Sequence, residues 1–253
     1  MPEVCQREIG EAAISHWYSR GMKERIPRFR ATQTLHDFQR LVQEVYGIAN
    51  TRDYSVSDLL IQEQRFAMRT LKGIRKGDPK KTKFNLLITL SWLSSIANLM
   101  HIDLQEEIWK RFPNACSYCG KRPCACLAEK PVMRKKRKST SQPKPQTLAQ
   151  FQRMFKAIYP PEKRTLTHAG IHLAEEMGEV SEAIYNYLGA HTSEHLNEIP
   201  LEIADLVSCI FGVANSLSVD VAKELASMFR RGCHICHKSP CACSFAFVVS
   251  LRT

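Results

Sequence analysis

TLHDFQRLVQEVY, residues 34–46, recurs as TLAQFQRMFKAIY at residues 147–159. Thr, Leu, Phe, Gln, Arg and Tyr keep their places in the two segments. Further along, residues 97–126 align with residues 214–243 without a gap, and both stretches end in the same cysteine pattern. Self-similarity of this kind indicates a tandem duplication, and the fold of one copy is then the fold of both.

Each copy has the apolar periodicity of helices. In the second copy, Leu173, Met177, Val180 and Ile184 recur at three- and four-residue steps, which places them on one helical face. We therefore expect an all-α protein of two tandem four-helix units, with helices at 34–48, 56–75, 84–101, 103–112, 147–158, 167–188, 199–217 and 219–230. The tail, Phe245–Leu251, is the one segment that suggests a short strand.

The composition is that of a globular chain with an anionic partner. Apolar residues make up 44% of the 253 residues, and the formal charge is +11, which favours nucleotide, nucleic acid or an acidic surface. No uninterrupted apolar stretch approaches the ~20 residues that span a bilayer. Glu3, Arg7, Glu8 and Glu11 stand where a signal peptide would be apolar, so we expect a cytoplasmic protein without a membrane segment.

Composition changes along the chain divide it into five parts. The linker at 129–146 contains three prolines and the basic run Arg134–Lys138, and we expect it to be disordered. It serves either as a tether or as a binding segment for nucleic acid or a partner protein. The five parts are an N-terminal extension (1–33), a first copy with its cysteine module (34–128), the linker (129–146), a second copy (147–232) and a second cysteine module with the tail (233–253).

Two acidic pairs in the second copy point to a divalent cation. Glu176 and Glu179 are three residues apart in HLAEEMGEVSEAI, and Glu202 and Asp205 are three apart in EIADLVSCI, so each pair lies on one helical face. Clustered carboxylates repel one another unless a cation joins them. Oxygen-only ligands suit Mg²⁺ or Mn²⁺, whereas the alternative is a pair of solvated helical faces.

These segments resemble the signature of the MazG-like all-α nucleoside triphosphate pyrophosphohydrolases, which is EExxE followed by ExxD on a later helix. The resemblance covers roughly residues 147–230. It implies a four-helix core, Mg²⁺ at Glu176, Glu179, Glu202 and Asp205, and hydrolysis of a nucleotide to its monophosphate and pyrophosphate. It further implies a water-orienting role for Glu175. Asn215 lies about three turns after Asp205 and could contact the sugar or base, or simply cap a helix end.

The first copy lacks this acidic set. Glu63 stands at the position of Glu176, but Phe66 replaces Glu179, and Asn85 and Ile88 replace the later pair. Related enzymes work as dimers or tetramers in which one unit completes the pocket of another. The resemblance therefore suggests that the first copy is an inactive partner in an intramolecular pseudo-dimer, which could assemble into a further homo-oligomer.

The cysteine modules, residues 116–126 and 233–243, share the spacing C-x2-C-x4-C-x-C. Four thiolates in such spacing can hold one structural Zn²⁺, and a reducing compartment favours metal over disulfides. A redox-active CxxC and intramolecular disulfides are the alternatives, and His234 or His237 could replace a thiolate in the second module. The predicted zinc ligands are Cys116, Cys119, Cys124 and Cys126, and Cys233, Cys236, Cys241 and Cys243.

Two functions follow from these motifs. The first is a Mg-dependent nucleotide pyrophosphohydrolase with structural zinc. The second is a non-enzymatic zinc-containing adaptor that binds nucleic acid or a partner protein. The intact acidic set in one copy favours the first, because an adaptor has no need of carboxylates in one copy only.

Overall fold

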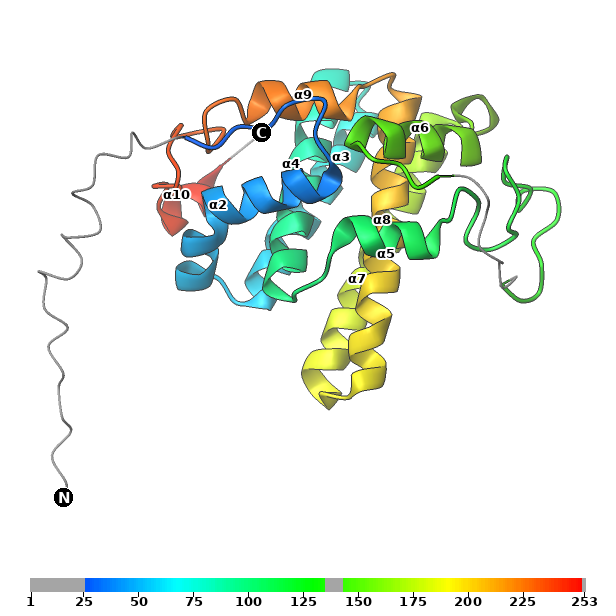
Figure 1. The fold of residues 1–253 in the computed structure, drawn as a ribbon, viewed down its shortest axis with the longest axis horizontal. Coiled ribbons are helices and arrows are strands. Elements are labelled where there is room, and N and C mark those ends of the chain that lie inside the picture. Colours follow the sequence, from blue (N-terminus) through cyan, green and yellow to red (C-terminus); the bar gives the residue numbers. More distant parts are fainter. Residues whose placement is uncertain (1–25, 135–142, 252–253) are drawn as a thin grey trace, which may run out of the picture.

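The computed structural model describes residues 26–134 and 143–251 (Figure 1). All regular secondary structure within these ranges is helical, as the periodicity predicts. The predictions for most of the N-terminal extension and for the centre of the linker fall on residues 1–25 and 135–142, which lie outside the described residues. The helices are α2 (Leu35–Asp53), α3 (Val56–Arg75), α4 (Pro79–Leu99), α5 (Leu104–Arg111), α6 (Leu148–Ile158), η1 (Pro161–Lys163), α7 (Leu166–Ala190), α8 (Ser193–Ser216), α9 (Val221–Met228) and α10 (Phe245–Ser250).

Two pairs of equivalent helices, α2 with α6 and α5 with α9, begin with equivalent caps. Thr34 and Thr147 each start a helix with a capping box, in which a side chain and a backbone N–H satisfy each other. Asp103 caps the short helix α5, and Asp220 caps the equivalent helix α9. Each aspartate side chain accepts a hydrogen bond from a backbone N–H of the first helical turn. A shared cap at a shared position fixes the same helix start in each copy, so the duplication extends from sequence to local structure.

Several segments depart from the prediction. Helix α2 ends at Asp53 instead of residue 48, and α4 begins at Pro79 instead of residue 84. The tail and α8 differ as well. Residues 245–250 form α10, capped by Ser244, instead of a strand. A lone strand leaves its backbone groups unpaired, whereas the helical turn pairs some of them locally. Arg65 donates to the carbonyls of Val248 and Val249 at 3.0 and 2.9 Å. Helix α8 also begins at Ser193, earlier than expected, and continues through Pro200.

The long helix α8 is the centre of the core. It packs on α7, α5, α6 and α4, and by length and composition it could cross a bilayer, contrary to the expectation from the sequence. However, 67% of its apolar window is buried inside the fold. Burial of this kind is what the core helix of a globular protein requires.

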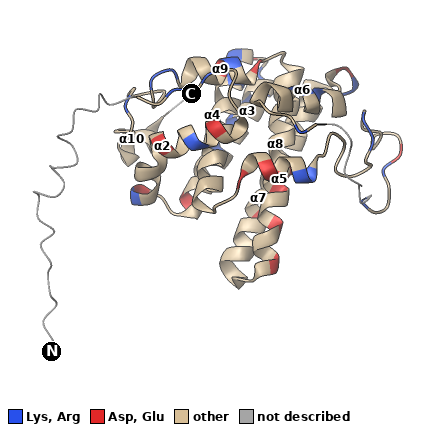
Figure 2. Cartoon of the chain, in the orientation of Figure 1, with Lys and Arg blue, Asp and Glu red and all other residues tan. Residues whose placement is uncertain are grey.

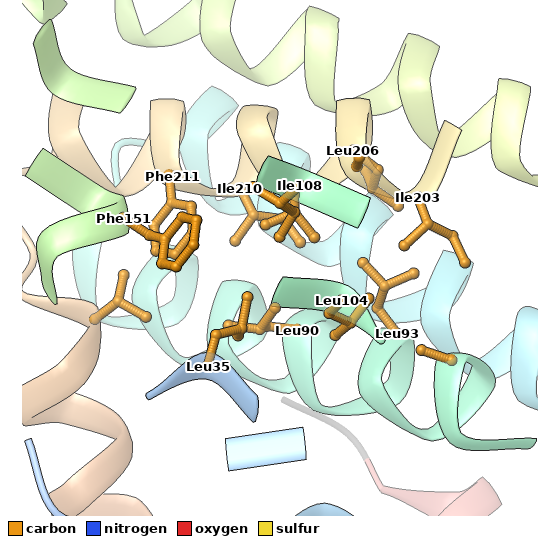
Figure 3. Close-up of a cluster of buried hydrophobic side chains, with 14 of the residues drawn as sticks. Leu35, Leu90, Leu93, Leu104, Ile108, Phe151, Ile203, Leu206, Ile210 and Phe211 are labelled. Carbon is orange, nitrogen blue, oxygen red and sulfur yellow. The ribbon is translucent and has the colours of Figure 1, made fainter. Parts of the chain in front are cut away.

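One apolar cluster joins the two copies. Figure 3 shows Phe151, Ile203 and Ile210 of the second copy facing Leu90 and Leu104 of the first, and these side chains are at most 1% exposed. Since burial of one such side chain stabilises the fold by about 1.5–3 kcal/mol, neither copy has a complete core without the other.

Each cysteine module packs on the copy that it does not follow. The backbone N–H of Cys124 donates to the carbonyl of Ile158 in α6, and that of Cys241 donates to the carbonyl of Val45 in α2, both at 2.7 Å. These two hydrogen bonds are equivalent in the two copies. The exchange places the module of the first copy beside the acidic helices of the second.

Glu63 on α3 is a carboxyl group buried in the apolar first copy. Its side chain is 0% exposed, and neither of its oxygens has a hydrogen-bond partner among the described residues. Burial raises the pKa of Glu63 to about 8, because a charged carboxylate is poorly solvated there. Ionisation of Glu63 therefore opposes folding.

We expect Glu63→Gln to flatten the pH dependence of stability. Glu63 titrates at about 8 in the fold, against 4.5 in an exposed setting. Its contribution to stability is most favourable below the lower pKa and is lost as the pH rises to the higher one. Relative to the native protein, the free energy of unfolding of the variant should rise by up to about 1.4 kcal/mol per pH unit between about pH 5 and about pH 8. Thermal unfolding across this range measures the gain, and parallel Tm curves would contradict it.

Candidate functional site

The packing of α7 against α8 brings carboxylates together. Leu173, Met177 and Val180 bury one face of α7, which leaves Glu176 and Glu179 at the edge of the helix pair. One oxygen each from Glu176, Glu179 and Glu202 lies within 4.8 Å of the others. Figure 2 shows acidic positions (red) along the projecting α7–α8 hairpin and basic positions (blue) at the end of α5 beside it.

Asp205 lies beside this trio, paired with an arginine of the first copy. Both its oxygens accept from Arg111 Nε at 3.1 Å, and Arg111 Nη2 also donates to Oδ2. The two side chains are only 8% and 13% exposed. A second guanidinium, that of Arg134, lies 3.5 Å from Asp205 Oδ2 and is 44% exposed. The structure thus gathers three of the predicted ligands and holds the fourth in an ion pair between copies.

Full ionisation of the trio is unfavourable in the absence of a cation. Burial, followed by repulsion from Asp205 and Glu179, raises the pKa of Glu176 to about 8. Burial and the same neighbours raise the pKa of Glu202 to about 7. One oxygen of each of these two glutamates is buried without a hydrogen-bond partner in the described part of the chain. Unpaired, repelling carboxylate oxygens fit a hard divalent cation, which would satisfy them and remove the repulsion.

A cavity of about 250 Å³ opens beside the carboxylates. Its acidic lining comes from α7 and α8, and further lining comes from the first cysteine module and the residues after it. Three aromatic and three basic side chains also line this cavity: Phe112, Tyr118, Tyr159, Lys130, Arg134 and Arg164. A cavity of this composition can hold a ligand that is planar at one end and anionic at the other.

Two further predicted residues lie outside the trio. Glu175 is exposed and contacts the ring of His172, with 3.5 Å between Oε2 and Nδ1. Asn215 accepts from Gln152 Nε2 at 3.0 Å and ties α8 to α6. The first copy keeps the equivalent bond, from Gln39 Nε2 to Asn98 Oδ1 at 3.0 Å. This hydrogen bond persists in the copy that lacks the carboxylates. A structural role for Asn215 therefore explains its presence without a contact to substrate.

Sequence reasoning placed Arg134 in the basic linker but did not single out Arg111, although a comparison of the copies contains the signal for Arg111. Where the second copy has Asp205, the first has Ile88, and where the first has Arg111, the second has Met228. The acid and its partner are therefore both replaced by apolar residues at the equivalent place. Such paired differences between repeats indicate contact across the two copies.

Both cysteine modules gather four thiols around one point. The four Sγ atoms of each module lie within 4.8 Å of one another. Neighbouring sulfurs are 3.5–3.9 Å apart, close to the ~3.8 Å edge of a tetrahedron with Zn–S bonds of ~2.3 Å. The sulfurs are not at disulfide distance, and these cysteines are free thiols. The clusters therefore have the geometry of zinc sites.

Backbone groups support the thiol clusters. Tyr118 N–H donates to Cys116 Sγ and Ile235 N–H donates to Cys233 Sγ, both at 3.4 Å. Such bonds stabilise thiolates and orient them toward a metal. His234 is engaged elsewhere, since its Nδ1 lies 2.9 Å from the hydroxyl of Tyr46. Four cysteines complete each cluster without a histidine.

Comparisons with protein-family models, with curated proteins and with solved structures found no match. The likeness to MazG-like enzymes therefore rests on the EExxE and ExxD segments of the sequence alone.

We expect protein purified without added zinc to contain about two zinc ions per chain, one in each closed four-thiolate site. Cys119→Ser should reduce the content to about one ion, because it removes one ligand of the first site. Cys209→Ser, outside both modules, is the matched control and should keep both ions. Elemental analysis with thiol titration measures this, and zinc-free protein with oxidised thiols would contradict it.

Proposed function

We propose that the chain is a Mg-dependent nucleotide pyrophosphohydrolase built from two tandem MazG-like four-helix units. The observation that carries this proposal is the group of carboxylate oxygens from Glu176, Glu179 and Glu202, within 4.8 Å of one another at the edge of a cavity with aromatic and basic walls. The orphaned oxygens of two of these glutamates support a cation rather than a solvated face.

The chain's own residues have separable tasks at this site. Glu176, Glu179 and Glu202 would hold Mg²⁺ or Mn²⁺, with Asp205 positioned beside them by Arg111. When bound, the cation supplies neutralisation of phosphate charge and polarisation of a phosphate oxygen or water. The apolar backing of α7 and α8 keeps the glutamates at fixed separations, and the aromatic wall provides a surface for a base.

The first copy acts in this proposal as an inactive partner. Its α5 provides Arg111 to the acidic site, and its cysteine module forms one wall of the cavity. The reciprocal hydrogen bonds of Cys124 and Cys241 support an intramolecular pseudo-dimer of the two copies. A related oligomeric enzyme would need a second chain for what the duplication here provides within one.

The proposal is tested by incubating the purified full-length protein with Mg²⁺ and a panel of ribo- and deoxyribonucleoside triphosphates. Release of pyrophosphate and of the monophosphate in equal amounts is the expected result. Release of orthophosphate alone, or no turnover of any nucleotide, would contradict the proposal and leave the adaptor function.

We expect Glu179→Gln to abolish turnover while leaving the metal-free protein as stable as before or more stable. The substitution removes one cation ligand, and it also removes one of the charges that repel Glu176 in the absence of metal. Turnover and thermal unfolding without Mg²⁺ measure the two effects. Glu63→Gln, the equivalent change at a carboxylate of the first copy, is the control and should retain turnover. Full activity of Glu179→Gln would contradict the site.

A further inference from the structure

The segment that follows the first cysteine module lines the same cavity as the carboxylates. Lys130 Nζ lies 5.0 Å from the centre of the Tyr118 ring, and Arg134 Cζ lies 5.6 Å from it. Both cationic side chains therefore pack on the same aromatic ring. All three side chains line the cavity that Glu176 and Glu179 also line.

The two arginines that contact Asp205 differ in how firmly they are held. Arg111 is 13% exposed and contacts both carboxylate oxygens, so it is fixed to that residue. Arg134 is 44% exposed, and its one contact with Asp205 is 3.5 Å long. Exposed pairs of this length contribute little to stability. Arg134 can therefore exchange this contact for a stronger one with an anionic ligand.

The first copy has an equivalent cavity in which this chemistry is absent. Arg134 and Leu251 stand at the same distance along the chain after the last cysteine of their modules. Leu251, Phe66 and Ile88 line the cavity of the first copy, at the places of Arg134, Glu179 and Asp205 in the second. The basic side chain and the acidic ones are replaced together, as expected if they serve one ligand.

We propose that Lys130 and Arg134 bind the terminal phosphates of a polyphosphate ligand beside the cation that the carboxylates would hold. The inference that this ligand is a nucleoside triphosphate rests on the proposed function. A pyrophosphate group carries more negative charge than one divalent cation neutralises, and the two basic side chains that line the same cavity complete the balance. Guanidinium and ammonium groups form charge-assisted hydrogen bonds to phosphate oxygens. The start of the linker, directly after the first cysteine module, thus provides the anion-binding half of the site.

The test is calorimetric titration of inorganic pyrophosphate, in the presence of Mg²⁺, into the full-length zinc-loaded protein. We expect the double variant Lys130→Gln/Arg134→Gln to bind pyrophosphate roughly 10- to 100-fold more weakly, the range for loss of hydrogen bonds to a charged partner. The matched control is Lys121→Gln on the same module, which pairs with Glu129 at 3.8 Å and does not line the cavity. It should bind as the native protein does, and equal zinc content shows that the module is intact.

Unchanged pyrophosphate affinity in the double variant would overturn the inference, as would no detectable binding to the native protein. A single-stranded oligonucleotide serves as a second ligand: binding of it alone, lost in the double variant, would also overturn the inference in favour of a nucleic-acid surface. The readout is independent of turnover. A native protein that hydrolyses no nucleotide but binds pyrophosphate through these residues refutes the proposed function alone, whereas turnover with unaltered affinity refutes this inference alone.

Discussion

The buried ion pair between Arg111 and Asp205 is the interaction on which the site depends. Removing two charges from water is costly, and it is tolerated only where the geometry is good and the remaining donors and acceptors are satisfied. Here the pair forms between α5 of one copy and α8 of the other, so it exists only when the copies share a core. The same contact that joins the copies also orients a carboxylate at the edge of the acidic cavity. Assembly and site formation are therefore one event in this chain.

Duplication has produced two equivalent cavities with opposite chemistry. In the first copy, Phe66 and Ile88 occupy positions that hold carboxylates in the second, and the cavity is reduced to about 60 Å³. Replacing clustered charges by apolar side chains removes both the repulsion between them and the cost of their desolvation. The first copy can therefore contribute these positions to apolar packing. Glu63 remains as an exception, buried without a partner and with a raised pKa. Glu63 stands at the position equivalent to Glu176 in the repeat, as expected of a remnant of an acidic site that both copies once had.

Local features were predictable from the sequence, and contacts between distant segments were not. The helix at Val56–Arg75 matches its predicted range because apolar periodicity and a Ser55 cap are encoded within it. The start of α8 was missed because Pro200 usually marks a helix boundary, and the tail was misread because a short β-branched run fits both strand and helix. The acidic residues could be named from their spacing, but their partner lies 94 residues away. The contact between Asp205 and Arg111 depends on how the two copies pack together. In the sequence, the only sign of this contact is the paired replacement by Ile88 and Met228 at the equivalent positions.

The exchange of modules also gives a reason for a cluster of four thiols in each half of the chain. A short segment without helices buries too little apolar surface to hold a fixed position, whereas a thiolate cluster closed by a metal fixes its backbone directly. The first module thereby holds Tyr118 against the second copy, and the basic residues that follow it stay at the mouth of the acidic cavity. The second module directs an apolar tail over the other cavity, where Arg65 and Arg69 hold the tail by its carbonyl groups. The segment after the first cysteine module thus places Lys130 and Arg134 at one cavity, whereas the segment after the second module covers the other cavity with apolar residues such as Leu251. The difference between these two segments accounts for part of the difference between the cavities.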